Sequence, residues 1–175
     1  MANVSATKQG TPGSINEGAS FKREQVIDFN DIVNAGTYSD NDTVTYTIPV
    51  LAGEIVEAVG VKLITAFDDS GSGDELNVEV GLAGGDVDGF ISTAALHTDQ
   101  TEISYVVNTG AFFTAETGTV AGTADPSNAT NNKIFLTDDT IDILVTPNVS
   151  TGTDYSLAEL NAGKFKVVVY LRDLN

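Results

Sequence analysis

The 175-residue sequence contains no cysteine, no tryptophan and a single histidine, His97. The lack of cysteine excludes disulfides, thiolate–metal sites and cysteine nucleophiles. A Ser-His-Asp unit would have to use His97, and no nucleophile-elbow motif accompanies it. Phosphate-binding, dinucleotide-binding and metalloprotease motifs are also missing. We therefore expect His97 to be a loop residue, and we predict no catalytic residues and no bound cofactor.

Basic residues are scarce, because eight Lys and Arg stand against 25 Asp and Glu, for a net charge of −17. No basic residue lies between Lys62 and Lys133. Binding to nucleic acid depends on clustered cations that replace phosphate counterions, so we exclude nucleic acids and anionic membranes as partners. The charge predicts a soluble protein whose copies repel one another until they dock specifically.

Long apolar runs are absent too. No uncharged stretch approaches the ~20 residues that a membrane span needs, and residues 1–14 lack the apolar core of a secretory signal. These absences predict synthesis in a cytoplasm without export through a standard signal.

The sequence is rich in threonine, which favours strands, and in glycine, asparagine and aspartate, which favour turns. Strict alternation of apolar and polar residues is typical of a strand with one buried face. Such alternation recurs in about eight segments with no convincing amphipathic helix, which predicts an all-β fold, an antiparallel β-sandwich that is jelly-roll-like. The clearest predicted strands are 24–29, 43–48, 55–67, 75–81, 103–107, 140–146 and 164–174.

The stretch 55–81 is expected to organise the rest of the chain. Its two alternating segments flank an acidic, Gly/Ser-rich piece, so we predict a long hairpin. Pro49 should end the preceding strand or place it at a sheet edge, because proline cannot donate to a ladder. Residues 157–163 are a candidate helical turn ended by Gly163, and residues 90–98 are compatible with a strand or a helical turn.

The chain divides into an N-terminal arm, 1–23, and a single β-sandwich domain, 24–175. The arm has few apolar side chains, several glycines and three of the eight basic residues: Lys8, Lys22 and Arg23. Such a composition predicts flexibility in solution. A disordered leader and an arm that docks on a neighbouring surface both remain open.

Three acidic clusters are candidate sites for a hard cation, since calcium binds six to eight oxygens. They are Asp68, Asp69 and Asp74; Asp86 and Asp88; and Asp138, Asp139 and Asp142. The DVDG run at 86–89 resembles the middle of an EF-hand loop, but Gly84 and Ala95 stand where the first ligand and the final glutamate belong. Solvated turns are the simpler interpretation, and we predict no metal site.

Carbohydrate binding would need aromatic rings that stack on sugars, and carbohydrate cleavage would need a pair of carboxylates. Any acidic β-protein contains carboxylate pairs, so these are not a specific signal. Tyr38, Tyr105 and Tyr155 are candidate stacking groups, in a chain of which only 7% is aromatic.

The run 48–68 resembles a pattern of tailed-bacteriophage virion proteins. In that pattern a "P-x-G" turn leads into a long alternating strand that ends near "T-A-F-D", and an acidic loop and an "L-x-V" strand follow. The corresponding residues here are Pro49, Gly53, Thr65, Ala66, Phe67, Asp68, Leu76 and Val78. The segments TIDILVT and VVVYLRDL are also similar to that group. The likeness covers most of the chain after about Glu24 and does not include 1–23.

The resemblance implies a non-enzymatic virion structural protein of the small β-sandwich capsid decoration, or cement, type. Such a protein would lie on the capsid exterior after synthesis in the host cytoplasm. Its implied partners are the major capsid protein and further copies of itself, as a homotrimer or a dimer. Two other functions stay open: a tail fibre or spike domain that binds a host glycan through loops 82–100 and 114–132, and a small glycan-cleaving domain that uses two carboxylates.

Overall fold

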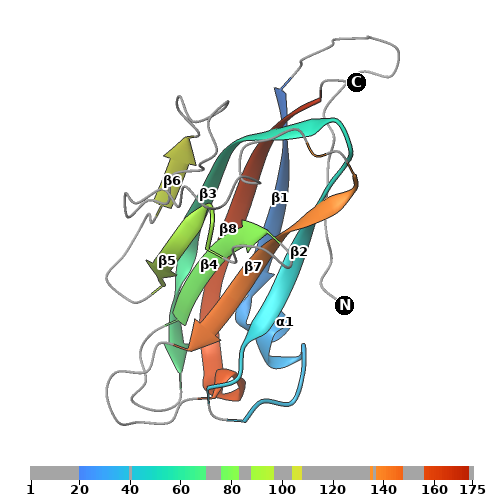
Figure 1. The fold of residues 1–175 in the computed structure, drawn as a ribbon. Coiled ribbons are helices and arrows are strands. Elements are labelled where there is room, and N and C mark those ends of the chain that lie inside the picture. The colour runs from blue at the N-terminus through green and yellow to red at the C-terminus, as the bar shows by residue number, and fades with distance from the viewer. Residues whose placement is uncertain are drawn as a thin grey trace.

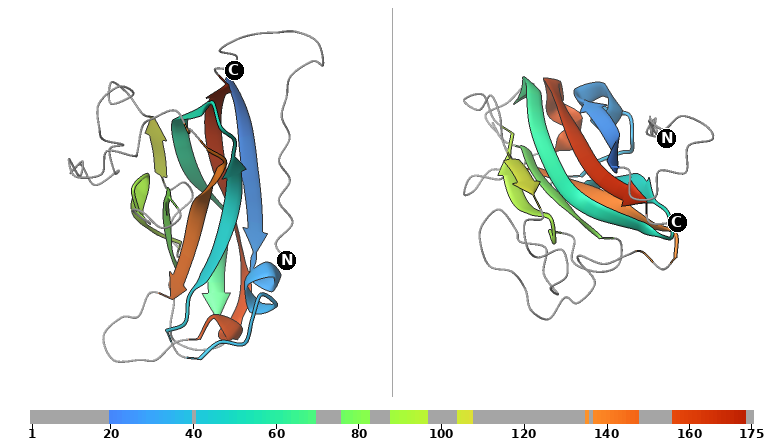
Figure 2. Two further views of the ribbon diagram at one scale, coloured as in Figure 1. Left: turned by 45° about the vertical axis from the view of Figure 1, so that its right-hand side comes forward. Right: turned by 90° about the horizontal axis from the view of Figure 1, so that it is seen from above.

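The computed structural model describes residues 20–39, 41–69, 76–82, 88–96, 104–107, 135, 137–147 and 156–173. These residues form eight strands, one short α-helix and one 3-10 helix. The strands make two four-stranded sheets that are stacked as two layers (Figure 1, Figure 2). Every strand pair is antiparallel. The predicted all-β sandwich is confirmed.

Sheet A has the strand order β1-β8-β3-β6. Its strands are β1 (Ser20–Asp28), β3 (Glu54–Asp69), β6 (Ser104–Val107) and β8 (Leu160–Asp173). The long strands β3 and β8 pair from Glu54 opposite Asp173 to Asp69 opposite Leu160, with bulges along the way. On the other side of β8, β1 pairs from Ser20 opposite Arg172 to Asp28 opposite Lys164. The two ends of the described domain therefore lie side by side.

Sheet B has the strand order β2-β7-β4-β5. Its strands are β2 (Val44–Val50), β4 (Leu76–Leu82), β5 (Ile91–Ala95) and β7 (Asp139–Pro147). Within sheet A, β1 pairs with β8 and β3 with β6; within sheet B, β2 pairs with β7 and β4 with β5. This pairing is consistent with the predicted jelly-roll-like winding. Pro49 lies in β2 at the edge of sheet B, as its chemistry predicts.

The core lies between the two sheets, where alternate residues of each strand point inward. Its largest fully buried side chains include Phe67, Phe165, Ile27, Leu76 and Ile143. The rings of Phe67 and Phe165 lie 5.9 Å apart at 58°, a favourable tilted arrangement for an aromatic pair. Burial of each such side chain stabilises the fold by about 1.5–3 kcal/mol. The alternation that predicts the strands is thus the pattern that fills the core.

The predicted hairpin over 55–81 is wrong. β3 belongs to sheet A and β4 to sheet B, so the two segments lie in opposite layers. β3 pairs with β8 and β6, whereas β4 pairs with β7 and β5. Alternation shows that a strand has one buried face. Two consecutive alternating strands can therefore pair in one sheet or pack against each other from two sheets.

The first strand begins four residues earlier than predicted. Ser20 to Arg23, which the sequence assigns to the arm, belong to β1. The inward face of this strand carries Phe21, Arg23, Gln25 and Ile27, and the two polar residues among them obscure the alternation. Residues 1–19 lie outside the described residues, so the docking role of an N-terminal arm stays a prediction.

A five-residue helix, α1 (Phe29–Val33), replaces the predicted end of the first strand and the start of a connection. Asp28 is its N-cap: Asp31 N donates to Asp28 Oδ1 at 3.1 Å, and Asp28 N donates to Asp31 Oδ2 at 3.0 Å. This reciprocal pair is a capping box, which satisfies backbone donors at the start of a helix. The signal is visible in the sequence, with aspartate where glutamate is usual.

The predicted helical turn at 157–163 is a 3-10 helix that spans Leu157–Glu159. Gly163 does not end it, because β8 already begins at Leu160. Gly163 lies inside β8 with a φ of 125°, and a Cβ at this position would be 2.2 Å from a ring carbon of Phe67. The glycine is required by the close approach of the Phe67 ring and by the positive φ.

Candidate docking surface

The outer face of sheet A gathers the positive charge of the described structure. Every lysine and arginine among the described residues belongs to sheet A, and all of them except Arg23 point away from the core. We call this surface the lysine face. Its charged residues are Lys22, Glu24 and Asp28 of β1, Glu57, Lys62 and Asp68 of β3, and Lys164, Lys166 and Arg172 of β8.

The strand register brings these residues together from distant parts of the sequence. Val26, Lys166 and Lys62 form one row across β1, β8 and β3. Directly opposed residues of an antiparallel pair point to the same side of the sheet. Lys62 and Lys166 are therefore neighbours on the surface, although they belong to opposite halves of the chain.

Carboxylates of β1 balance part of this charge. Glu24 Oε2 lies 3.0 Å from Lys22 Nζ and 3.5 Å from Lys166 Nζ. Asp28 Oδ2 lies 3.8 Å from Lys164 Nζ. The hydrogen bond from Lys22 and the attraction of Lys166 hold the pKa of Glu24 below its ordinary value, although partial burial acts in the opposite direction.

We expect the Glu24 carboxylate to contribute pH-dependent stability. Its pKa is lowered by folding, so the contribution is present above the ordinary value of 4.5 and is lost as the pH falls through the lower folded-state pKa. For partly exposed pairs the contribution should be about 0.5–1 kcal/mol. Glu24→Gln should lower the free energy of unfolding by this amount at pH 7 and leave it unchanged at pH 2. A Lys22→Met variant should raise the pKa of Glu24 in an NMR titration, and an unchanged pKa would contradict the assignment.

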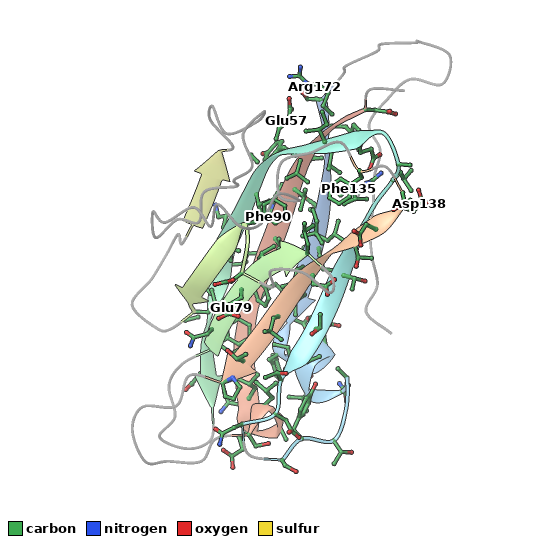
Figure 3. The ribbon with its side chains drawn as sticks, viewed as in Figure 1. Glu57, Glu79, Phe90, Phe135, Asp138 and Arg172 are labelled. Carbon is green, nitrogen blue, oxygen red and sulfur yellow. The ribbon has the colours of Figure 1, made fainter. Side chains whose placement is uncertain are left out.

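A second ion pair lies at the end of the sheet where β1 begins and β8 ends. Arg172 of β8 pairs with Glu57 of β3, and Ser20 Oγ of β1 donates to Glu57 Oε2 at 2.6 Å. Figure 3 shows Glu57 and Arg172 close together at this end. The three strands are thus connected through one carboxylate. Cations and carboxylates are nearly balanced on the lysine face, in a chain whose net charge is −17.

The same face exposes apolar surface. Val26 of β1 is 43% exposed and Ile64 of β3 is 49% exposed. They are two of the three large apolar side chains that are exposed among the described residues, and Leu51 is the third. Ile64 lies at a bulge of β3, where the register shifts between Leu63 and Thr65. The lysine face therefore combines balanced charge with accessible hydrophobic side chains.

The outer face of sheet B has a different chemistry. Its outward residues include Thr45 and Thr47 of β2, Thr140, Asp142 and Thr146 of β7, and Asn77 and Glu79 of β4. No lysine or arginine occurs among the described residues of this face. The two outer faces of the sandwich therefore offer hydroxyls and carboxylates on one side, and lysines with apolar groups on the other.

Two edge strands of the sandwich carry features that disfavour pairing with another strand. Pro49 of β2 lacks the N–H that a ladder requires. Arg23 of β1 points into the core, where it is 5% exposed. Proline and inward-pointing charges are features by which sheet proteins protect their edges from further pairing. We therefore expect contacts with other molecules through the faces of the sandwich and not through these two edges.

A buried ion pair fixes the position of β1. Arg23 Nη1 and Nη2 donate to Glu54 Oε2 and Oε1 at 2.5 and 2.7 Å, and the two side chains are 6% and 1% exposed. Arg23 Nη1 also donates to Pro49 O at 2.7 Å, and Leu51 N donates to Glu54 Oε2 at 2.8 Å. The pair ties β1 to the turn that carries the chain from sheet B to sheet A. The buried pair therefore holds β1, which carries one side of the lysine face, from the core side of the sheet.

The same turn accounts for part of the third acidic cluster. Ala52 N donates to Asp138 Oδ1 at 3.0 Å, and Gly53 N donates to Phe135 O at 2.7 Å. Phe135 N in turn donates to Glu54 O at 3.0 Å. Asp138 and Phe135 lie beside this turn in Figure 3. Asp138 thus joins the start of β7 to the turn between β2 and β3.

The other members of this cluster also bind protein groups. Asp139 Oδ1 accepts from Thr140 N at 2.8 Å, and Asp142 Oδ1 accepts from Thr140 Oγ1 at 2.9 Å. In the part of the chain that the structure describes, no group of three or more His, Cys, Asp or Glu could hold a metal ion. The absence of a metal site stays a prediction for all three clusters, and Asp74 and Asp86 lie outside the described ranges.

Of the tyrosines proposed to stack on sugars, only Tyr38 has a described side chain. Its Oη donates to Ile32 O at 2.7 Å, and its ring packs against the core. Burial raises the pKa of Tyr38. Tyr38 therefore holds the connection that follows α1. Tyr155 and His97 lie outside the described residues, and only the backbone of Tyr105 is described.

Sequence reasoning missed the lysine face. The alternation of Lys164 and Lys166 in the last strand is the one local signal for it, and Lys22 was assigned to the arm.

No helix among the described residues is long and apolar enough to cross a membrane.

No protein-family model matches the sequence, and no curated protein is significantly similar to it. A solved structure with a similar fold is a chain of the cyanophage Pam1 capsid asymmetric unit, with a TM-score of 0.52 and 16% sequence identity. The likeness covers 97% of this chain and 96% of that chain, so the two chains have about the same length. Their sequences have diverged far, and what they share is the fold. The chain is similar in fold, over nearly its whole length, to a component of a cyanophage capsid asymmetric unit.

Proposed function

We propose that this chain is a non-enzymatic structural protein of a tailed-phage virion, and that it binds the outside of the head as a decoration or cement protein. The observation that carries the proposal is the likeness in fold to a chain of the cyanophage Pam1 capsid asymmetric unit. Because the likeness spans both chains almost end to end, it concerns a whole subunit. A fold alone does not determine a function, so the proposal draws on the sequence resemblance as well.

The residues that carry the sequence resemblance occupy positions that specify this sandwich. Pro49 and Gly53 flank the crossing from sheet B to sheet A, and Gly53 has a φ of 87°. Phe67 packs near the end of β3 against Phe165. Leu76 is fully buried on β4. The resemblance and the likeness in fold therefore support the same proposal from different observations.

The proposed partners are the major capsid protein and further copies of this chain, as a homotrimer or a dimer. Nucleic acid and membrane are not among them. The protein would be made in the host cytoplasm and would reside on the capsid exterior. It would act by mass action, because a protein that binds the assembled shell and not its dissociated subunits stabilises the shell.

The proposal is tested on particles of the phage that encodes this chain. A gold-labelled antibody against the purified protein should label heads. Heads from which the protein has been stripped should disassemble at a lower temperature, and addition of the purified protein should restore the original temperature until the sites are saturated. Label at the tail tip would favour the glycan-binding alternative, and the absence of label from particles would overturn both.

A truncated protein tests the N-terminal arm separately. Removal of residues 1–19 leaves β1 complete, since this strand begins at Ser20. We expect the truncated protein to keep its circular dichroism spectrum and to lose affinity for stripped heads. Equal affinity with and without residues 1–19 would show that the segment is a leader and not a docking arm.

A further inference from the structure

We infer that the lysine face is the surface through which one copy of this chain binds another. The inference deepens the proposed function, of which self-association is a part, and it takes its biological setting from that proposal. It rests on the distribution of charge, on the exposed apolar side chains and on the nature of the edge strands.

The charge distribution makes this face the easiest one for a second copy to approach. Each copy carries a net charge of −17, so two copies repel one another wherever carboxylates meet carboxylates. Every outward-pointing lysine and arginine among the described residues lies on the lysine face. Charged groups across an interface set which surfaces can meet, and like charges that face one another cost several kcal/mol. The lysine face is where that repulsion is least.

The lysines of this face come from three strands of sheet A and are accompanied by carboxylates of β1 and β3. Lys62 and Lys166 are directly opposed in the register of β3 and β8. Glu24 reaches Lys166 at 3.5 Å from the β1 side. Because cations and carboxylates are nearly balanced here, a second copy meets less repulsion at this face than at the outer face of sheet B, where the described residues include no lysine or arginine.

The apolar side chains supply the part of the contact that excludes water. Val26 lies at the β1 side of the face and Ile64 at the bulge of β3, and both are more than two-fifths exposed. Lys166 of β8 lies between Val26 and β3 in the register, so the two apolar side chains flank the lysines, and each can bury apolar area against the facing copy. Pro49 and the inward-pointing Arg23 disfavour one alternative, which is pairing of β1 or β2 with a strand of a neighbour.

Two matched double variants test the inference on the full-length protein. Val26→Glu with Ile64→Glu adds two negative charges to the lysine face and removes its exposed apolar groups. Thr45→Glu with Thr47→Glu adds the same charge to exposed positions of the outer face of sheet B. Val26 is opposite Lys166, so a glutamate there is compatible with the fold, which circular dichroism and thermal unfolding verify.

Sedimentation equilibrium over a range of concentrations should show a native mass that is a multiple of 18.3 kDa. We expect the lysine-face variant to weaken self-association by at least about tenfold and the sheet B variant to leave it unchanged. Equal behaviour of the two variants, or a native protein that stays monomeric, would overturn the inference. A lysine-face variant that keeps the native mass and fails to bind stripped heads would also overturn it, and the proposed function would still stand.

Discussion

Replacement of Glu54 by glutamine should lower the free energy of unfolding by about 3–5 kcal/mol, because removal of one member of a buried ion pair leaves the other charge without compensation. Arg23 is 5% exposed, and the Glu54 carboxylate accepts hydrogen bonds from both of its terminal nitrogens. Glutamine has nearly the same shape, so the loss is due to charge and not to a cavity. Urea unfolding at pH 7, followed by circular dichroism, measures the difference.

A double-mutant cycle provides the control. Arg23→Met alone should cost a similar amount, since it leaves the Glu54 carboxylate buried without its cation. Arg23→Met combined with Glu54→Gln removes both charges, and its cost should be smaller than the sum of the two single changes by more than about 1 kcal/mol. Strictly additive losses would show that the two side chains contribute independently and that the ion pair is not what holds β1.

Substitution of Gly163 by alanine should lower the free energy of unfolding by about 2–6 kcal/mol, since backbone strain at a positive φ and overpacking of the core each cost about 1–3 kcal/mol. Gly163 has a φ of 125°, and its added methyl group would overlap the ring of Phe67 at 2.2 Å. Phe67 is fully buried beside Phe165, so its ring cannot turn outward without leaving the core. Thermal and urea unfolding measure the loss.

Gly36→Ala is the matched control for this substitution. A Cβ on Gly36 would meet nothing closer than a ring carbon of Tyr38 at 3.9 Å, and an exposed change of this kind alters stability by no more than about 0.5 kcal/mol. Phe67→Leu introduced together with Gly163→Ala should recover part of the loss. It removes the overlap with the Phe67 ring, whereas the backbone strain at the positive φ remains. A Gly163→Ala protein as stable as Gly36→Ala would contradict the requirement for glycine.

The individual strands were predictable from the sequence because each buries one face. β7 extends one residue beyond the predicted strand at each end, and β2 continues through Pro49 because it lies at an edge. β8 begins at Leu160, four residues before the predicted start of the last strand. Which strands pair was not predictable, as the wrong hairpin over 55–81 shows. Alternation records burial and contains no information about the neighbour across a ladder or across the core.

The candidate docking surface was harder to predict because it is made by pairing. Lys62 and Lys166 become neighbours only through the register of β3 and β8. Lys22 and Arg23 are adjacent in the sequence, yet β1 turns one to the surface and the other into the core. The sequence assigns this basic pair to a flexible arm because Arg23 and Gln25, on the inward face of β1, interrupt the apolar alternation that indicates a strand. The nearby α1 is only five residues long, and its capping box was the sole local signal.

The pairing of β1 with β8 sets Ser20 opposite Arg172, so the domain is suited to circular permutation. Ends that lie on adjacent strands can be joined by a short linker without disturbing either strand, and circular permutation is tolerated where chain ends are close. New ends could then be opened beside Gly36, in the connection after α1, at the far end of sheet A from Ser20 (Figure 1). A peptide fused there would be displayed at the opposite pole of the sandwich from the point where residues 1–19 join it.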